Sequence, residues 1–109
     1  MKILFLALLL VTVTSVFSQT SRTSSVKQIN DVRFKINTEI IYYYNKLIIE
    51  GIPYKILEII PLYNPKIEKA NMIYTDKYVI ISARWNDGNS TVSIQKGNDL
   101  IIYYLDKND

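Results

Sequence analysis

The side chains that could carry out chemistry are few, and the composition excludes several kinds of catalytic site. The chain has no histidine and no cysteine, which excludes a Ser-His-Asp triad, a thiol nucleophile and a zinc site with imidazole or thiolate ligands. Its three glycines are too far apart for a phosphate-binding loop. Acid–base chemistry by Asp99 or Glu58 with Tyr103 or Tyr104 remains. Because such residues are common as surface carboxylates and packed tyrosines, we expect no catalytic, cofactor-binding or metal site.

Aromatic side chains are the second feature that could serve a site, because tyrosine occurs nine times. Tyr42, Tyr43 and Tyr44 are consecutive, and three consecutive positions of a helix cannot all face a core. At least one of these rings should therefore be partly exposed, and exposed tyrosine is enriched at binding sites. With Trp85, these tyrosines form a possible binding surface. The alternative is that the rings cover a small core while their hydroxyl groups reach water.

The sequence Asn89-Ser90-Thr91 matches the acceptor pattern for N-glycosylation. It directly follows Asp87-Gly88, which favours a hairpin because this pair tolerates the positive φ angles of a tight turn. Asn89 is therefore a candidate glycosylation site on an exposed turn. The alternative is that Asn89 serves only the turn itself.

Residues 1–18 have the order of a secretory signal peptide. Lys2 precedes an apolar run from Ile3 to Val11, and Val16-Phe17-Ser18 is a possible cleavage site. The run is shorter than the roughly 20 apolar residues that a membrane-spanning helix needs. We therefore expect a secreted, extracellular protein with no stable membrane insertion after signal cleavage.

The remainder is expected to contain a flexible leader (residues 19–25), a single domain (residues 26–105) and a polar tail (residues 106–109). The leader has no apolar anchor. From Val26 to Glu50 the core positions recur in steps of three and four, which predicts one long amphipathic helix. These positions are Val26, Ile29, Arg33, Ile36, Ile40, Tyr43 and Leu47.

The segment from Pro53 to Ile60 fits two structures. As a helix it would start with Pro53 and would place Tyr54, Leu57 and Ile60 on one face. As a strand it would alternate its side chains between two faces. We expect a short helix here.

Beyond this segment the apolar pattern changes to a period of two, which indicates strands. Strands are expected over Ile67 to Tyr74, Tyr78 to Trp85, Thr91 to Gln95 and Leu100 to Leu105. The predicted fold class is therefore α+β, with the long helix packed on an antiparallel meander of about four strands.

This layout weakly resembles two related families, the cystatins and the nuclear-transport-factor-like cone folds. The stretch from Arg33 to Lys46 is similar to the cystatin helix, and Tyr78 to Gly88 is similar to the middle hairpin of that family. The inhibitory Gln-x-Val-x-Gly loop has no counterpart, and Arg84 stands where the second inhibitory loop has proline before its tryptophan. A helix over Pro53 to Ile60 would favour the cone fold, and a strand would favour the cystatin layout.

These features predict a non-enzymatic secreted protein that binds an extracellular protein or a small apolar ligand. The resemblance implies an alternative, a cystatin-like inhibitor of cysteine proteases. No nucleic-acid partner is expected, because the net charge of +3 is spread along the chain and forms no basic stripe. No cofactor is expected.

Overall fold

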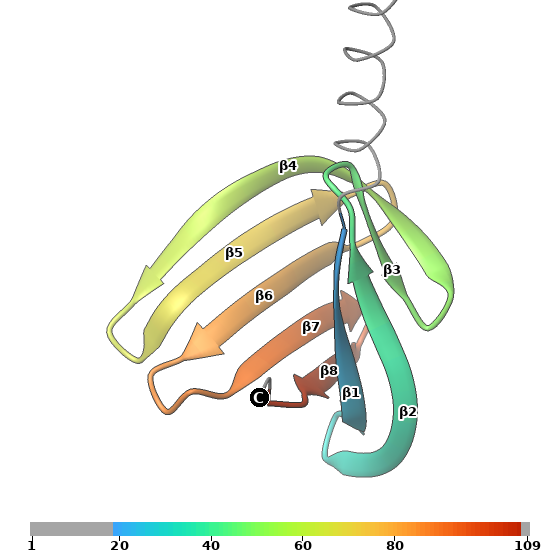
Figure 1. Ribbon diagram of the computed structural model, residues 1–109, viewed down its shortest axis with the longest axis vertical. Coiled ribbons are helices and arrows are strands. Elements are labelled where there is room, and N and C mark those ends of the chain that lie inside the picture. The colour runs from blue at the N-terminus through green and yellow to red at the C-terminus, as the bar shows by residue number, and fades with distance from the viewer. Residues whose placement is uncertain (1–18, 108–109) are drawn as a thin grey trace, which may run out of the picture.

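The computed structural model describes residues 19–107 and shows an all-β fold. Eight antiparallel strands form a closed barrel in which each strand pairs with the next and β8 pairs back with β1 (Figure 1). The strands are β1 (Thr20–Ile29), β2 (Val32–Tyr42), β3 (Lys46–Ile49), β4 (Ile52–Asn64), β5 (Ile67–Thr75), β6 (Val79–Trp85), β7 (Ser90–Lys96) and β8 (Asp99–Leu105). No helix among the described residues is long and apolar enough to cross a membrane.

Tight turns set this up-and-down topology. Asn30 has φ 54°, and Glu50 and Gly51 have φ 51° and 77°, which are values that primed hairpin turns require. Gly88 and Gly97 also have positive φ angles, in the turns that follow β6 and β7. The short connections explain why every strand pairs with its sequence neighbours.

The long helix expected from Val26 to Glu50 is wrong, because this segment forms parts of β1, β2 and β3. Ile36 and Ile40 both contribute to the core. Their spacing of four is even, so it fits one face of a strand as well as one face of a helix. The odd steps of the apparent helical stripe, from Val26 to Ile29 and from Arg33 to Ile36, lie within β1 and β2 and join residues on opposite faces of those strands.

The short helix expected over Pro53 to Ile60 is also wrong, because these residues lie within β4. Tyr54 is buried, whereas Leu57 and Ile60 are exposed, so the apolar face of the predicted helix does not exist. Residues 20–25, expected to be flexible, form the first half of β1. The proposed signal peptide lies outside the described residues.

The α+β class is therefore corrected to an all-β barrel. The four strands expected in the C-terminal half are present as β5 to β8. Both the cystatin-like and the cone-fold layouts require a long helix packed on a sheet, and residues 19–107 contain none. Although Pro53 to Ile60 is a strand, the cystatin-like description does not hold, because its helix is missing.

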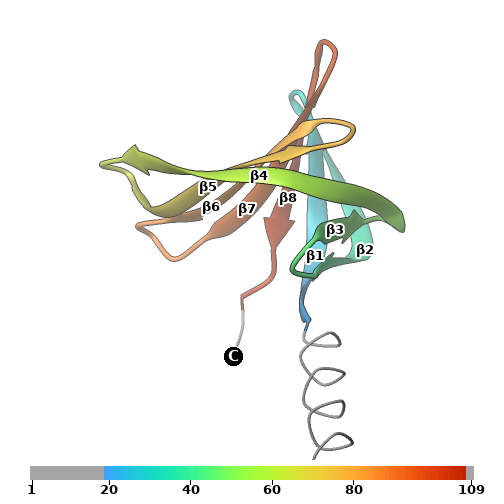
Figure 2. The ribbon, with the colours of Figure 1, turned by 90° about the horizontal axis from the view of Figure 1, so that it is seen from above.

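The barrel is narrow and apolar at one end and flared at the other. Figure 2 shows β4 to β8 as one broad curved layer, with β1 to β3 on one side of it. β1 pairs with β8 only from Ser24 to Ile29, and β3 pairs with β4 only up to Lys55. The start of β1 and the second half of β4 consequently diverge from the strands on their other side. The narrow part contains the core residues Ile40, Leu47, Ile49, Tyr54, Ile73, Ile80, Val92, Ile94, Ile101 and Tyr103.

Candidate ligand-binding site

The inward-facing positions change from apolar to polar along the strands that lead to the flared end. On β6, the buried Ile80 is followed at intervals of two by Ser82 and Arg84. On β5, which runs the opposite way, Lys69 lies two positions beyond Asn71 and directly opposite Arg84. Side chains two apart on a strand share a face. The sheet surface that lines the core therefore continues into a polar and cationic surface.

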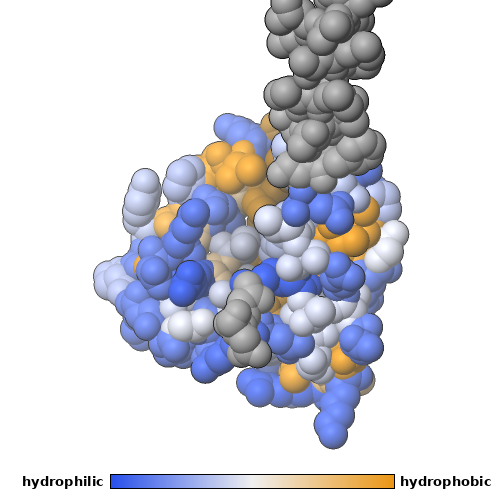
Figure 3. Space-filling view, viewed as in Figure 1, coloured by the Kyte–Doolittle hydropathy of each residue, from blue (hydrophilic) through white to orange (hydrophobic). Residues whose placement is uncertain are grey.

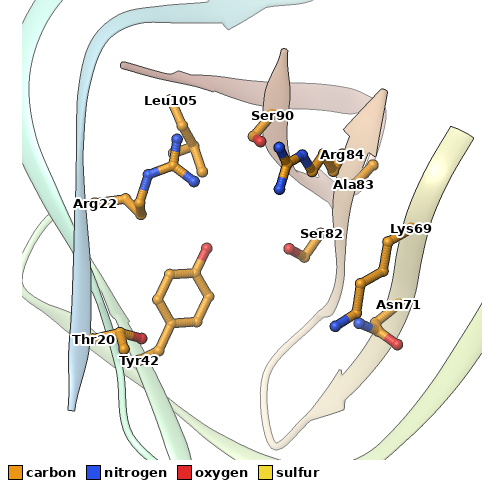
Figure 4. A pocket seen from close by; sticks show the side chains of 10 residues that line it. All are labelled: Thr20, Arg22, Tyr42, Lys69, Asn71, Ser82, Ala83, Arg84, Ser90 and Leu105. Carbon is orange, nitrogen blue, oxygen red and sulfur yellow. The ribbon is translucent and has the colours of Figure 1, made fainter. Parts of the chain in front are cut away.

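These side chains line a pocket of about 320 Å³ at the flared end. Its lining comes from β1, β2, β5, β6, β7 and β8, and consists of Thr20, Arg22, Tyr42, Lys69, Asn71, Ser82, Ala83, Arg84, Ser90 and Leu105. We call it the mouth pocket. Figure 4 shows Arg22 and Tyr42 reaching into it from one side, with Ser82, Arg84 and Lys69 on the other side.

Two other hollows formed by residues 19–107 lack this construction. One of about 590 Å³ is lined only by residues 61–71, which belong to a single hairpin. Another of about 280 Å³ lies beside Trp85. On the face shown in Figure 3, hydrophilic residues dominate the central and lower parts, and hydrophobic residues gather in the upper part. The mouth pocket is the site that joins side chains from most of the barrel.

The mouth pocket is cationic. Arg22, Lys69 and Arg84 line it, and no aspartate or glutamate is among its lining residues. Lys69 and Arg84 are cross-strand neighbours, and like charges in that position repel each other. Glu68 lies 3.4 Å from Nε of Arg84, but both side chains are more than half exposed, so this surface ion pair offsets little of the charge.

Arg22 is the most enclosed of the three cations. One terminal nitrogen, Nη2, donates to the backbone oxygen of Asp106 at 2.8 Å. Its Nε is buried and has no hydrogen-bond partner, and it is the one such side-chain atom found in residues 19–107. A buried donor without a partner costs about 1–3 kcal/mol. An anion bound beside Arg22 would offset that cost.

Asp106 fixes the backbone near Arg22; its carboxylate is not part of the pocket lining, although its charge interacts with that of Arg22. Its carboxylate accepts hydrogen bonds from the Ser25 and Thr23 hydroxyl groups at 2.8 and 2.9 Å. These bonds hold the pKa of Asp106 below its usual value, and the bond from Ser25 has the largest effect. The carboxylate is thus used on the outer side of β1, and the guanidinium of Arg22 contacts only the main chain of this residue.

The opposite end of the barrel has a cation that is fully paired. Lys27 bonds Glu50 at 3.0 Å and lies over the Tyr103 ring, with 17% of its side chain exposed. Burial acts to lower the pKa of Lys27, but the hydrogen bonds to Glu50 and Tyr103 outweigh it and raise the pKa. The contrast shows that this fold pairs an inward cation where a carboxylate is in reach.

Tyr42 supplies the one phenol of the mouth pocket. Burial raises its pKa, while the nearby Ser82 hydroxyl and the charge of Arg22 act in the opposite direction. The phenol is therefore neutral at physiological pH and can donate a hydrogen bond.

This shift predicts a loss of stability in alkali. Because the folded-state pKa of Tyr42 is raised above its unfolded value of 10.0, its contribution is constant below that pH and falls as pH rises toward the folded pKa. Urea unfolding between pH 8 and pH 11 should show this fall, and Tyr42→Phe should reduce its size. Burial also raises the pKa of Tyr103, so a smaller fall should persist in the variant. An identical pH profile in both proteins would contradict the assignment.

No protein-family model, curated protein or solved structure matches this chain.

Of the residues that the sequence singled out for binding, only Tyr42 lines the mouth pocket. Tyr43 and Tyr44 follow the end of β2, and Tyr44 is 78% exposed. The three tyrosines are not helical, so the helical reason given for their exposure is wrong. Tyr44 is exposed because it lies just beyond the end of β2.

Trp85 and Asn89 lie together at a different place, the hollow beside the turn that follows β6. The Trp85 indole Nε1 donates to the Thr91 hydroxyl at 3.1 Å. Asn89 is exposed, and its Nδ2 donates to Asp87 at 3.0 Å. Glycosylation of Asn89 and secretion stay predictions.

The carboxylates and tyrosines considered for acid–base chemistry are not brought together. Asp99 accepts a hydrogen bond from Asn30 between two turns, and Tyr104 donates to Gln28. Tyr103 lies in the core beside Lys27. Within residues 19–107, no group of three potential metal ligands is close enough to hold an ion.

Sequence reasoning missed Arg22, Lys69 and Arg84. The signal available was a charged residue at an inward position of a strand, as in the series Ile80, Ser82, Arg84. On β1, that signal appears only once the segment is assigned to a strand and the register with β2 is known.

Proposed function

We propose that this protein is a non-enzymatic binding protein that holds a small organic anion in the mouth pocket. The observation that supports this most is the convergence of three cations, without an acidic residue in the lining, on a pocket formed by six strands. Eight-stranded barrels are wide enough to hold one small ligand. A charged group in such a site gives orientation and specificity.

The pocket also offers contacts for the body of a ligand. The Tyr42 ring and Leu105 provide apolar surface, and Asn71, Ser82 and Ser90 provide polar groups. The lining favours a ligand with an anionic group over the wholly apolar ligand expected from the sequence. Because the lining has no carboxylate, and the chain has no histidine or cysteine that could act as general base or nucleophile, we assign the site binding and not catalysis. The protease-inhibitor alternative rested on the cystatin layout and is not proposed.

The test uses the fluorescent probe 1-anilinonaphthalene-8-sulfonate, which joins an aromatic body to one negative charge. The protein should bind it saturably, with one probe per chain. Ser82→Phe places a large side chain in the mouth pocket without changing its charge and should abolish the saturable signal. Ser93→Phe is the matched control, because Ser93 is on β7 and lines the Trp85 hollow instead.

Retention of binding by Ser82→Phe and loss in Ser93→Phe would move the site to the outer surface. Circular dichroism of both variants would establish that they retain the β-sheet signal. Absence of saturable binding in the wild-type protein, by fluorescence and by calorimetry, would contradict the proposed function.

A further inference from the structure

We propose that the anionic group bound in the mouth pocket is a phosphate monoester in its dianionic form. This inference rests on the proposed function and specifies the ligand class. It follows from the charge that the pocket must neutralise and from the directions of its donors.

The charge of the lining favours a dianion. Arg22, Lys69 and Arg84 contribute three positive charges, and Glu68 faces only Arg84, at 3.4 Å. Even if Glu68 neutralised Arg84 completely, two positive charges would remain, and because the pair is exposed it offsets less than that. A singly charged sulfonate or carboxylate would leave one cation without compensation beside another, whereas a phosphate monoester carries close to two negative charges at neutral pH.

The positions of the donors also favour a phosphate group. Arg22 approaches from β1, while Lys69 and Arg84 approach from the facing strands β5 and β6 (Figure 4). The hydroxyl groups of Tyr42 and Ser82 lie between these two sides. The two oxygens of a carboxylate accept hydrogen bonds mainly within one plane, which suits a guanidinium fork on one side. A tetrahedral phosphate with three terminal oxygens can accept from both sides at the same time.

A neighbouring hollow extends the positive surface. About 240 Å³ in volume, it shares Arg22, Arg84 and Ser90 with the mouth pocket and adds Lys107 and Gly88. The cationic region therefore continues past the pocket along the end of β8. Lys107 places a fourth cation beside the pocket.

Calorimetric titration of the wild-type protein at pH 7.5 tests the ligand class. Phenyl phosphate should bind at least about tenfold more tightly than benzenesulfonate or benzoate, because charge-assisted hydrogen bonds are roughly twice as strong as neutral ones and the dianion engages more of them. Succinate, whose two charges are far apart, should bind no better than the monoanions.

The pH dependence supplies an internal control. The second pKa of a phosphate monoester is about 6, so lowering the pH from 7.5 to 5.0 should weaken phenyl phosphate binding by up to about tenfold. The facing groups are Arg22, Tyr42, Lys69, Arg84 and Lys107, with Glu68 beside Arg84 and Asp106 beside Arg22. The chain has no histidine or cysteine. Benzenesulfonate keeps one charge over this range, so its affinity should stay nearly constant.

A variant that removes one positive charge tests whether the pocket causes the preference for phenyl phosphate. Lys69→Gln should reduce the preference for phenyl phosphate over benzenesulfonate by about threefold or more, in line with a lost charge-assisted contact. Lys35→Gln is the control, because Lys35 is exposed and lies on β2 opposite Val26, away from the lining. It should leave the preference unchanged.

A separate experiment distinguishes a soluble phosphate ester from a lipid headgroup as the source of the phosphate group. Hexyl phosphate in solution is compared with phosphatidylcholine vesicles that contain phosphatidic acid. Binding of hexyl phosphate alone assigns the site to a soluble ester, and binding of the vesicles in addition assigns it to a lipid headgroup.

Equal affinities for phenyl phosphate and benzenesulfonate, with both bound at the mouth, would overturn the dianion inference and leave the proposed function in place. Tighter binding of succinate would also overturn it. If neither the phosphate nor the sulfonate probe binds, the proposed function itself fails.

Discussion

Replacement of Tyr54 by alanine should lower the free energy of unfolding by about 3–5 kcal/mol, the range observed when a large buried side chain is removed. Tyr54 is 1% exposed and is the largest fully buried side chain of the described core. It lies on β4 opposite Leu47 of β3, where the barrel wall is complete. The loss should appear in urea unfolding as a lower midpoint with little change in slope.

The same strand provides matched controls. Tyr63 is 91% exposed, so Tyr63→Ala should change the free energy of unfolding by no more than about 0.5 kcal/mol. Leu57 is 63% exposed, and Leu57→Ala should also have a small effect. In a helix over Pro53 to Ile60, Leu57 would share the buried face of Tyr54. A large destabilisation by Leu57→Ala would therefore contradict the strand.

Arg22→Gln should reduce the affinity for both phenyl phosphate and 1-anilinonaphthalene-8-sulfonate by about 10-fold to 100-fold. A hydrogen bond to a charged group contributes about 1.5–3 kcal/mol, and Arg22 is the cation whose Nε has no protein partner. Calorimetry measures the loss directly. Arg33→Gln is the control with the same change of charge, because Arg33 is exposed and lies over Tyr104.

Arg22 also bonds the backbone oxygen of Asp106, so the variant needs a stability measurement beside the binding one. We expect folding to be retained, because the Asp106 carboxylate still accepts from Ser25 and Thr23. A variant that melts like the wild-type protein and binds both probes with unchanged affinity would remove Arg22 from the site.

The C-terminal strands could be predicted from sequence because their turns are explicit. Asp87-Gly88 and Gly97-Asn98 separate apolar segments with a period of two. The N-terminal half lacks such clear punctuation. The turn at Asn30-Asp31 uses asparagine in a left-handed conformation and has no glycine. The adjacent strands contain many polar residues, so their apolar residues show no clear period of two.

The helix predicted for the N-terminal half does not form, because strand pairing overrides the local sequence pattern. Relative to β8, β1 contains a bulge between Ser24 and Val26, directly before the predicted helix, and it shifts the alternation of side chains by one position. Beyond it, the predicted stripe joins residues from opposite faces of β1 and β2. Only pairing with β2 and β8 fixes which side chains face inward, and neither register can be inferred from the local sequence.

The candidate site was predictable only in part for the same reason. Tyr42 was singled out because it is aromatic, and it lines the pocket. The three cations were seen as part of a dispersed charge of +3, although closure of the barrel brings Arg22 to the same pocket as Lys69 and Arg84. Lys69 and Arg84 follow Arg22 by 47 and 62 positions in the chain, and only the barrel topology makes them its neighbours.

The most decisive measurement is the mapping of amide chemical shifts in isotope-labelled protein during titration with phenyl phosphate. Shifts should concentrate on Arg22, Tyr42, Lys69, Ser82 and Arg84, and should saturate with one ligand per chain. Shifts confined to Trp85 and the turn after it, or scattered over surface lysines without saturation, would contradict a binding site inside the flared end of the barrel.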